Sequence, residues 1–199
     1  NRLKAKQISI KNIIINNIFD KQISIMDLEK NNFGIITMHR PSNVDNKKIL
    51  SGIIRFFIDE VSKDIPLVWP VHPRTQKRLI AFNLWQELID QKNIILLYPI
   101  GYHDMLKLNM DSSIMFTDSG GLQEECTILG TRCITLRWNT ERPITLKKYG
   151  GVSEIVGNNI SNIRNTYEEI MEIDFSPTIP KYWDGKTANR CLNAILDYK

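Results

Sequence analysis

The sequence predicts an α/β fold, a Rossmann-like parallel sheet with helices on both faces. Short apolar runs recur along the chain from Phe33 onward, and several are apolar almost throughout, as expected for strands that are covered on both faces. Between them lie longer stretches whose apolar residues recur at helical spacing. Strand–helix alternation of this length is typical of βαβ units, and therefore of a parallel sheet.

The predicted strands are six short runs, and helical patterns separate them. In chain order the strands cover residues 33–38, 67–71, 94–98, 113–117, 133–136 and 152–156. Proline cannot donate to a sheet ladder, so the second strand is expected to end at Pro70. Two of the intervening helical stretches cover residues 47–63 and 75–90.

The flanks differ in character from the centre. Residues 1–31 are rich in Ile, Asn and Lys with weak periodicity, and are expected to form a lead-in helix or a linker. Residues 32–180 are expected to form the Rossmann-like domain. Residues 181–199 contain a helical pattern with one apolar stripe, made of Ala188, Cys191, Leu192, Ile195 and Leu196.

Composition excludes several classes of protein. The chain has 199 residues, 42% hydrophobic and 24% charged, a balance unlike that of a disordered or fibrous protein. Its net charge of +4 is spread along the length, which argues against nucleic-acid binding. No apolar run approaches the ~20 residues that span a bilayer. The chain begins at Asn1, and we expect it to be a piece of a longer cytoplasmic protein.

The cysteines and glycines bear on metals and cofactors. Three cysteines lack metal-ligand spacing, and we expect them to be small buried residues in a reducing compartment. The G-x-G-x-x-G fingerprint is absent after the first strand, so NAD or FAD is not expected. We therefore predict no metal and no cofactor.

In an open parallel sheet, ligands bind beyond the carboxyl ends of the strands. His39 and Arg40 follow the first strand, where a histidine can titrate near neutral pH or donate to a phosphate. The alternative is a capping loop in which Asn43 or Asp45 starts the next helix. His72 follows the second strand and precedes a proline suited to a first helical turn, so a structural role is favoured there.

The strongest local signal follows the fourth strand. Ser119, Gly120 and Gly121 form a turn that leads into a helix. Glycines let the backbone approach a ligand closely, and a helix N-terminus presents free N–H groups to an anion. Glu124 and Glu125 are expected in the first turn, either to complement the helix dipole or to accept hydrogen bonds from the hydroxyls of a sugar.

Two arginines follow the fifth strand. Arg142 precedes a proline that would open a helix and orient the guanidinium, which can hold phosphate oxygens in a bidentate fork. The alternative is an ion pair of Arg142 with Glu141, or of an arginine with Glu125. His39, the Ser-Gly-Gly turn with Glu125, and Arg142 follow three different strands, and we expect them to line one cleft. Such a cleft suits a nucleotide or a nucleotide sugar.

These motifs resemble those of one known family. The segments are 39–45 (HRPSNVD), 72–75 (HPRT), 118–125 (DSGGLQEE) and 139–143 (NTERP). They occur in the order found in the non-hydrolysing UDP-N-acetylglucosamine 2-epimerases, and the similarity runs from about Phe33 to the end of the chain. The combination is highly specific, although no single segment is.

The resemblance implies a fold, a ligand and a reaction. The family has two Rossmann-like domains arranged as in GT-B glycosyltransferases, and this chain would be the C-terminal, UDP-binding half. His39, the catalytic candidate, would hold the diphosphate with Ser119, Gly120, Gly121 and Arg142. Glu125 would bind the ribose, and the segment from Ile100 to Met105 would cradle uracil. The reaction interconverts UDP-N-acetylglucosamine and UDP-N-acetylmannosamine by anti elimination and re-addition of UDP.

The resemblance also implies partners. The catalytic carboxylates belong to the N-terminal domain, so this chain alone is expected to bind UDP weakly and to epimerise nothing. The stripe at residues 188–196 is expected to be exposed and to pack toward that domain. The oligomeric state with precedent in the family is a homodimer.

Two departures from the family pattern leave alternatives open. Trp138 stands at a usually polar or acidic position, and Val152-Ser153 replaces a usual Thr-Asn pair. An epimerase of another UDP-amino sugar, such as a UDP-2,3-diacetamido sugar, is therefore one alternative. A GT-B glycosyltransferase is another, although Arg132 and Cys133 stand where retaining members often have a second glutamate. A non-catalytic UDP-binding domain is the third.

Overall fold

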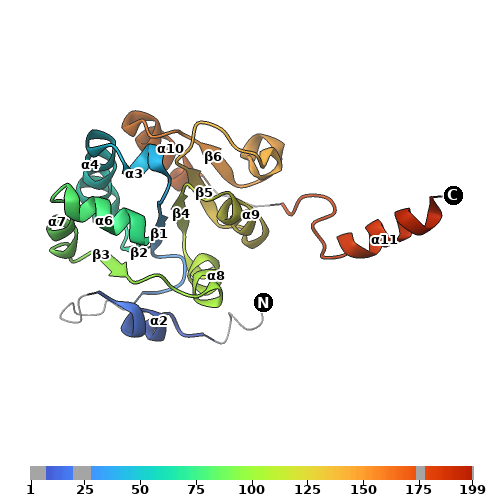
Figure 1. The fold of residues 1–199 in the computed structure, drawn as a ribbon, viewed down its shortest axis with the longest axis horizontal. Helices are drawn as coiled ribbons and strands as arrows, with labels where there is room; N and C mark the ends of the chain where they lie inside the picture. The colour runs from blue at the N-terminus through green and yellow to red at the C-terminus, as the bar shows by residue number, and fades with distance from the viewer. Residues whose placement is uncertain (1–7, 20–27, 174–177, 199) are drawn as a thin grey trace.

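The computed structural model describes residues 8–19, 28–173 and 178–198. The described residues contain a six-stranded sheet of order β3-β2-β1-β4-β5-β6 (Figure 1). All five neighbouring pairs are parallel. The predicted α/β fold with a parallel sheet is confirmed.

The strands agree with the predicted apolar runs to within a few residues at their ends. Their bounds are Gly34–Thr37 (β1), Leu67–Pro70 (β2), Ile94–Leu97 (β3), Ile114–Thr117 (β4), Arg132–Thr135 (β5) and Ser153–Ile155 (β6). β2 ends at its proline, as expected. In the centre, Thr37 of β1 pairs in register with Thr117 of β4, so these two strands end side by side.

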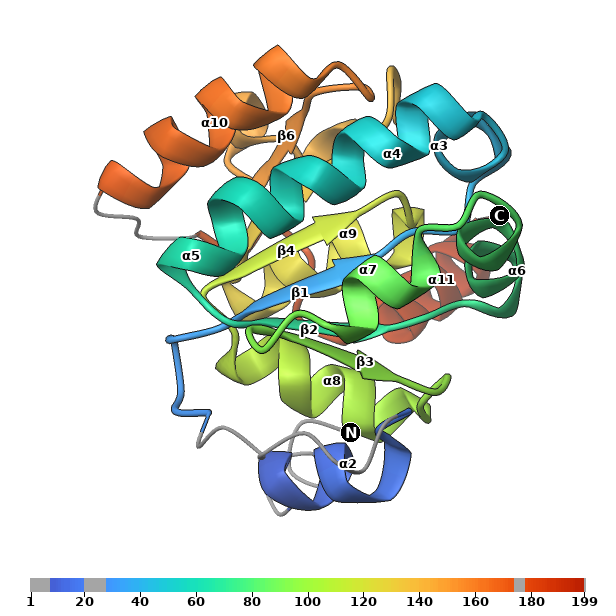
Figure 2. The ribbon, with the colours of Figure 1, turned by 90° about the vertical axis from the view of Figure 1, so that its left-hand side faces the viewer.

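Helices cover both faces of the sheet (Figure 2). A core that includes Trp69 and Phe116 lies on one face. It is covered by Lys47–Phe56 (α4), the π-helix Phe57–Val61 (η1), Ser62–Asp64 (α5), Pro73–Ala81 (α6), Trp85–Ile89 (α7) and Ile160–Glu172 (α10). A second core, which includes Ile35 and Met115, lies on the other face. It is covered by Ile10–Asn17 (α2), Tyr102–Asp111 (α8) and Gly120–Leu129 (α9).

One predicted helical stretch is divided in two. The pattern over residues 75–90 forms α6 and α7, with a break between them. Asn83 lies in the break with φ of 61°, a left-handed conformation that ends a helix and that Asn tolerates better than most residues. Apolar spacing continues across the break, so periodicity alone predicts one element.

The N-terminal segment covers an edge of the sheet. Ile13 and Ile14 of α2 are buried, and the chain then forms an antiparallel bridge from Ile18 to Leu97 of β3. The backbone N–H of Phe19 also donates to the carbonyl of Leu96 at 3.1 Å. This pairing occupies polar groups that an edge strand would otherwise expose. The rest of the lead-in segment, residues 1–7 and 20–27, lies outside the described residues.

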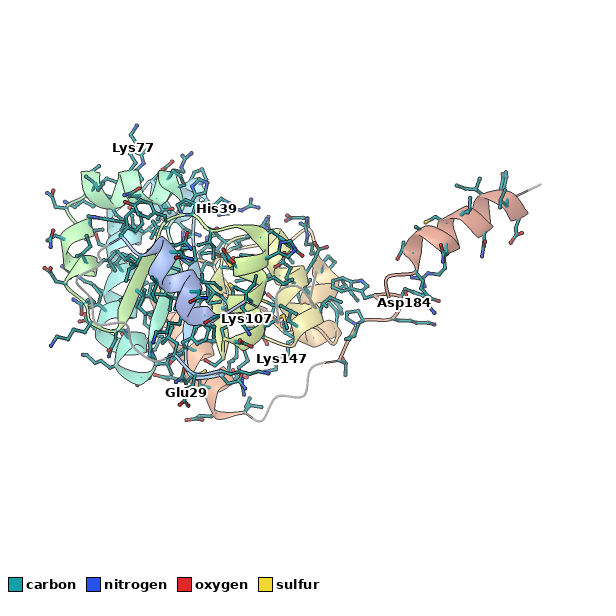
Figure 3. All side chains as sticks on the ribbon, turned by 90° about the horizontal axis from the view of Figure 1, so that it is seen from below. Glu29, His39, Lys77, Lys107, Lys147 and Asp184 are labelled. Atoms are coloured by element: carbon teal, nitrogen blue, oxygen red, sulfur yellow. The ribbon has the colours of Figure 1, made fainter. Side chains whose placement is uncertain are left out.

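The C-terminal helix α11, Thr187–Asp197, extends away from the sheet (Figures 1 and 3). An ion pair of 2.9 Å between Arg190 and Asp184 stabilises the turn that leads into it. The predicted exposure of its apolar stripe is confirmed, because Leu192, Ile195 and Leu196 are 55%, 71% and 66% exposed. The expectation of three buried cysteines is wrong for Cys191, which is exposed on the same helix.

Among the described residues, no helix combines the length and the apolar character needed to cross a membrane. In that same part of the chain, no group of three or more His, Cys, Asp or Glu side chains is placed to hold a metal ion.

Gly151 tests how tightly the loop before β6 is packed. A Cβ at this position would lie 2.0 Å from the carbonyl oxygen of Thr145, whereas one at Gly101 would have no atom within 4 Å. Since the obstacle is backbone that also accepts a hydrogen bond from Val152, Gly151→Ala should lower the free energy of unfolding by about 3 kcal/mol. The matched control Gly101→Ala meets no atom but replaces the N-cap residue of α8, so it should lower the free energy of unfolding by no more than about 1 kcal/mol. Urea denaturation measures both; equal losses would contradict the packing.

Candidate functional site

The site lies where the sheet changes direction. From β1 the chain proceeds outward through β2 and β3, then returns to the centre and proceeds the other way through β4, β5 and β6. Adjacent strands β1 and β4 therefore send their following loops to opposite sides, which leaves a crevice between them. His39 lies two residues after the end of β1, and Asp118 directly follows β4.

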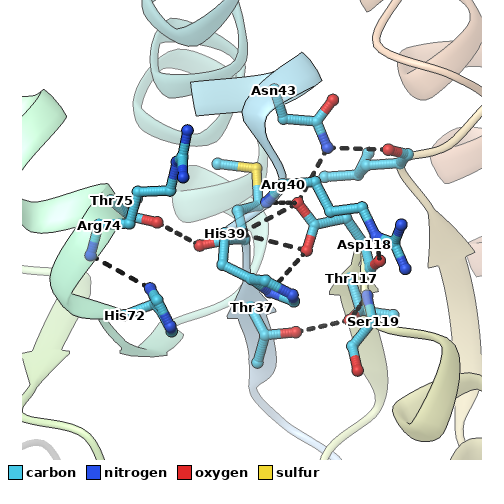
Figure 4. Close-up of polar contacts among 12 residues, drawn as sticks. Thr37, His39, Arg40, Asn43, His72, Arg74, Thr75, Thr117, Asp118 and Ser119 are labelled. Atoms are coloured by element: carbon cyan, nitrogen blue, oxygen red, sulfur yellow. Dashed lines mark hydrogen bonds and ion pairs between the residues drawn. The ribbon is translucent and has the colours of Figure 1, made fainter. Parts of the chain in front are cut away.

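The carboxylate of Asp118 is fully buried in this crevice, where four donor groups surround it (Figure 4). The backbone N–H groups of His39 and Arg40 donate to it at 3.0 and 2.9 Å. The side-chain amide of Asn43 donates at 3.0 Å, and Nδ1 of His39 lies 3.0 Å from Oδ1. Burial by itself would raise the pKa of Asp118, but the hydrogen bonds from His39 and Arg40 lower it below the usual value.

Asn43 extends this network to the next strand. Its amide also donates to the carbonyl of Leu136, just after β5, at 2.9 Å. Asn43 lies in the short helix α3, Pro41–Val44, and is itself buried. The alternative that Asn43 or Asp45 starts the next helix is wrong, because the side chain of Asn46 caps α4 by accepting from Ile49 N–H.

His39 and His72 face a cavity of about 190 Å³ at the strand ends. The imidazole of His39 is 39% exposed, and its centroid lies 5.3 Å from that of His72. Burial, and then the proximity of His39, lower the pKa of His72. The structural role favoured for His72 is present, since its Nδ1 accepts from the N–H of Arg74 at the start of α6.

The Ser-Gly-Gly turn begins α9, as the sequence predicts. The hydroxyls of Thr117 and Thr37 form a hydrogen bond of 2.6 Å. The hydroxyl of Thr117 also accepts a hydrogen bond from the N–H of Ser119 at 3.0 Å, so the turn is fixed to both central strands. Ser119 is the N-cap residue, but its hydroxyl makes no capping hydrogen bond. The positive end of α9 thus faces the crevice with N–H groups that an anion can bind.

The expected place of the two glutamates needs correction. Because α9 begins at Gly120, Glu124 and Glu125 lie in its second turn, and the first turn contains no acidic residue. Successive residues of a helix point about 100° apart, so the two carboxylates face different surroundings. Glu124 pairs with Arg142 and also borders a neighbouring pocket, which Glu125 lines as well.

Arg142 lies directly over the glycine turn. A Cβ on Gly120 would be 2.6 Å from Nη1 of Arg142, so only glycine permits this approach. The guanidinium forms ion pairs with Glu124 at 3.0 Å and with Glu141 at 2.6 Å. The alternative pairing with Glu141 is therefore present, whereas the acidic partner on α9 is Glu124 and not Glu125.

Two further contacts position the loop that carries Arg142. Buried Gln123 accepts a hydrogen bond from the hydroxyl of Thr140 at 2.8 Å, and this hydroxyl accepts from the N–H of Arg142 at 3.0 Å. The guanidinium of Arg137 lies 2.7 Å from the carboxylate of Glu141. The hydrogen bond from Arg137 is the main reason why the pKa of Glu141 is lowered to about 2. Pro143 then opens the short 3₁₀-helix Pro143–Thr145 (η2), as predicted.

Glu125 lines a second pocket, of about 370 Å³, with Tyr102 and Trp183 among its walls. One carboxylate oxygen of Glu125 is buried with no hydrogen-bond donor among the described residues. Burial, and then the charge of Glu124, raise the pKa of Glu125. Helices α8 and α9 contribute residues to both pockets.

The structure thus gathers most of the candidate residues, in two groups. His39, Ile100, Met105 and Ser119 line the smaller pocket. Gly120 and Arg142 are in contact at the start of α9, next to Ser119, and Gly121 is open to solvent. Glu125 lies in the adjoining pocket and not in the same one.

Sequence reasoning overlooked Asp118, Asn43 and Gln123 as organising residues. All three are buried polar side chains, and all three stand inside the motifs already recognised. Their adjacency to glycine, histidine and arginine was the available signal. Burial and the direction of their hydrogen bonds are not visible in the sequence.

Comparison with known proteins assigns the family. A family model described as UDP-N-acetylglucosamine 2-epimerase matches residues 6–196. The chain belongs to the UDP-N-acetylglucosamine 2-epimerase family. It is 39% identical over 166 residues, 82% of its length and 44% of the relative's, to the Methanocaldococcus jannaschii UDP-N-acetylglucosamine 2-epimerase.

Solved structures agree with this assignment. The Methanocaldococcus jannaschii enzyme in complex with UDP-GlcNAc and UDP superposes with a TM-score of 0.79 at 32% identity, covering 98% of this chain and 51% of that one.

A Pseudomonas aeruginosa UDP-2,3-diacetamido-2,3-dideoxy-D-glucuronate 2-epimerase is 34% identical over 112 residues, 55% of this chain and 29% of that protein. The chain spans about half the length of the curated family members that it matches over most of its own length. The expected fold, one Rossmann-like half of a GT-B-type enzyme, is confirmed.

The lowered pKa of Asp118 predicts how acid acts on stability. A carboxyl whose folded-state pKa is depressed stabilises the fold above its unfolded pKa of about 3.9, and this contribution disappears as the pH falls through the folded value. Asp118→Asn should therefore lower the free energy of unfolding by about 2–3 kcal/mol at pH 7, and the difference from the wild type should shrink below about pH 4. Denaturant titrations across this range measure it. The exposed control Asp197→Asn should show no such difference, and a gap between Asp118→Asn and the wild type that stays constant with pH would contradict the role.

Proposed function

We propose that this chain is the UDP-binding part of a UDP-N-acetylglucosamine 2-epimerase, an isomerase that interconverts UDP-N-acetylglucosamine and UDP-N-acetylmannosamine. One observation carries the proposal. His39, Ser119 and the N-terminus of α9 meet at the switch between β1 and β4, with Arg142 over Gly120. The arrangement occurs in a chain whose solved relative was crystallised with UDP-GlcNAc and UDP.

The diphosphate would lie against the start of α9. Ser119 and the free N–H groups of the helix donate to its oxygens, and Gly121 offers backbone with no side chain in the way. Arg142 is held by two carboxylates without a ligand, and phosphate oxygens would replace at least part of that pairing. The guanidinium is thereby kept at the place where the anion arrives.

The nucleoside would follow the groove between α8 and α9. Ile100 and Met105 supply an apolar wall for the base beside the diphosphate site. Glu125 has a buried oxygen without a donor, and a ribose offers two adjacent hydroxyls that can donate to a carboxylate. Such a bond would relieve the cost of leaving that oxygen unpaired.

The proposed reaction needs a leaving group whose charge is stabilised. A base removes the proton at C2 of the sugar, the electron pair forms a C1–C2 double bond, and the bond from C1 to the UDP oxygen breaks. UDP departs with both electrons of that bond, then adds back after C2 is reprotonated on its other face. Arg142, the α9 N-terminus and His39, our catalytic candidate, would stabilise the charge that develops on UDP.

The groups that move the C2 proton are proposed to lie in a second domain, as the family resemblance implies. The chain spans about half of its curated relatives, which leaves length for such a domain. We propose that residues 32–180 are the UDP-binding unit and that α11 packs toward the second domain. The exposed Leu192, Ile195 and Leu196 give α11 an apolar face that such a contact would bury.

An epimerase of a different UDP-amino sugar is the second candidate. Similarity to the Pseudomonas enzyme named for a diacetamido sugar favours it. Trp138, at a departure from the family pattern, is 66% exposed after β5, and its indole packs against Gly157. The identity of the sugar, a homodimer and a cytoplasmic location stay predictions.

Binding of UDP tests the assignment of residues. Glu125→Ala should weaken UDP about tenfold, because it removes the acceptor for the ribose hydroxyls, and should leave 2′,3′-dideoxy-UDP almost unaffected. Arg142→Ala should weaken both nucleotides, since it acts on the diphosphate that they share. Isothermal titration calorimetry measures the four affinities, and Arg190→Ala, on the C-terminal segment, is the matched arginine control. Equal losses of the two nucleotides in Glu125→Ala would contradict the ribose contact, and no binding of UDP by the wild type would overturn the function.

The division of labour between two domains gives a second expectation. The 199-residue chain incubated alone with UDP-N-acetylglucosamine should form no UDP-N-acetylmannosamine, because the proposed C2 base lies outside it. Proton NMR of the anomeric signals measures the product, with the Methanocaldococcus jannaschii enzyme as the positive control. Product formed by the chain alone would place the base within these residues.

A further inference from the structure

The imidazole of His39 is divided between two environments. Its Nδ1 lies 3.0 Å from the fully buried carboxylate of Asp118, and the ring, 39% exposed, borders the pocket at the strand ends. Figure 4 shows the ring between Asp118 and His72. One ring nitrogen is thus engaged by the protein interior, which leaves the other available to a ligand.

An ionised carboxylate only accepts hydrogen bonds, so the ring nitrogen facing it must carry a proton. We propose that Asp118 is a positioning residue that keeps Nδ1 of His39 protonated and stabilises the imidazolium, so that Nε2 donates a proton to a pyrophosphate oxygen in the pocket. The choice of pyrophosphate rests on the function proposed above. The same division of the ring between a buried carboxylate and a reacting group recurs where histidines act on substrates.

The other charged groups near His39 make Asp118 the deciding partner. Arg40 is its neighbour in sequence. His72, the N-cap residue of α6, has its ring centroid 5.3 Å from that of His39, and Arg74 lies in the first turn of α6. The positive charges of Arg40 and Arg74 disfavour a proton on His39, and His72 would compete with His39 for that proton. Arg74 is itself paired with Asp45, and burial together with His39 lowers the pKa of His72. Of the groups around His39, the buried carboxylate of Asp118 is the one that contacts Nδ1 directly, at 3.0 Å.

Asp118 also fixes backbone, so a structural role alone would look similar in a simple mutant. It accepts from the N–H groups of His39 and Arg40 and from Asn43, contacts that do not depend on the imidazole. The two roles differ in one consequence. If Asp118 acts through the imidazole, replacing Asp118 changes which ring nitrogen of His39 carries the proton. The same replacement then has little further effect on ligand binding in a variant that lacks the imidazole.

Protonation of the ligand-free chain is measured first. In ¹⁵N–¹H correlation spectra of the imidazoles, with His39→Gln to assign the signal, neutral His39 should have its proton on Nδ1. Asp118→Asn, which keeps the shape of the side chain, should raise the fraction of the neutral ring that has its proton on Nε2, because the group that accepts from Nδ1 loses its charge. A neutral ring protonated on Nε2 in the wild type would overturn the proposal, and this observation needs no variant of Asp118 to fold.

Ligand binding is measured second, with UDP-N-acetylglucosamine, whose pyrophosphate has no terminal group that titrates near neutrality. Calorimetry in two buffers of different ionisation enthalpy should show uptake of protons when this nucleotide sugar binds. Asp118→Asn should weaken binding about tenfold in the wild-type background and much less in His39→Gln, as expected for coupled residues. Equal losses in both backgrounds would overturn the proposal in favour of a structural role. Failure of the wild type to bind, with the expected tautomer of His39, would instead overturn the proposed function and leave the Asp118–His39 pair standing.

Discussion

A carboxylate without access to solvent must find its hydrogen bonds within the protein, and at the end of β4 this requirement organises the whole crevice. Asp118 is fully buried, and its donors come from the segment after β1, about 80 positions earlier in the chain. Asn43, one of these donors, also reaches the carbonyl of Leu136 after β5. Three strand ends are therefore held together by one charged group and one amide. An unpaired buried charge is costly, so none of these segments can move away independently.

The sheet was predictable because its strands are covered on both faces. Burial on two sides leaves little room for polar residues, so strands such as Ile94–Leu97 read as continuous apolar runs. The place of the site followed from the same topology, since polar residues such as His39 and Ser119 lie two residues after the end of a strand. The break at Asn83 was not predictable from periodicity, because a left-handed residue changes the direction of the chain without changing the spacing of its apolar neighbours.

Finer details of the site depended on quantities that a sequence does not display. Glu124 and Glu125 are adjacent, and a shift of the helix start by a single residue decides which of them meets Arg142. Gly120 was expected to admit a ligand, yet in the structure it also admits the guanidinium of Arg142. Asp118 was part of a recognised motif, but its role depends on its burial and on partners that are distant in sequence. Tertiary contacts, not local pattern, set these outcomes.

Electrostatics link the two sides of the crevice. On one side, Arg142 is held between Glu124 and Glu141, so its charge is nearly balanced before a ligand arrives. On the other, the charge of Asp118 faces His39 and is shielded from solvent. An incoming pyrophosphate would meet a cation that is already positioned and N–H groups that are already oriented, and would need to displace carboxylates rather than reorganise the loops. Preorganisation of this kind stabilises a departing anion without a cost of rearrangement at the moment of reaction. His39, Asp118, Ser119 and Arg142 all follow strands of this one sheet, so the sheet alone brings them together.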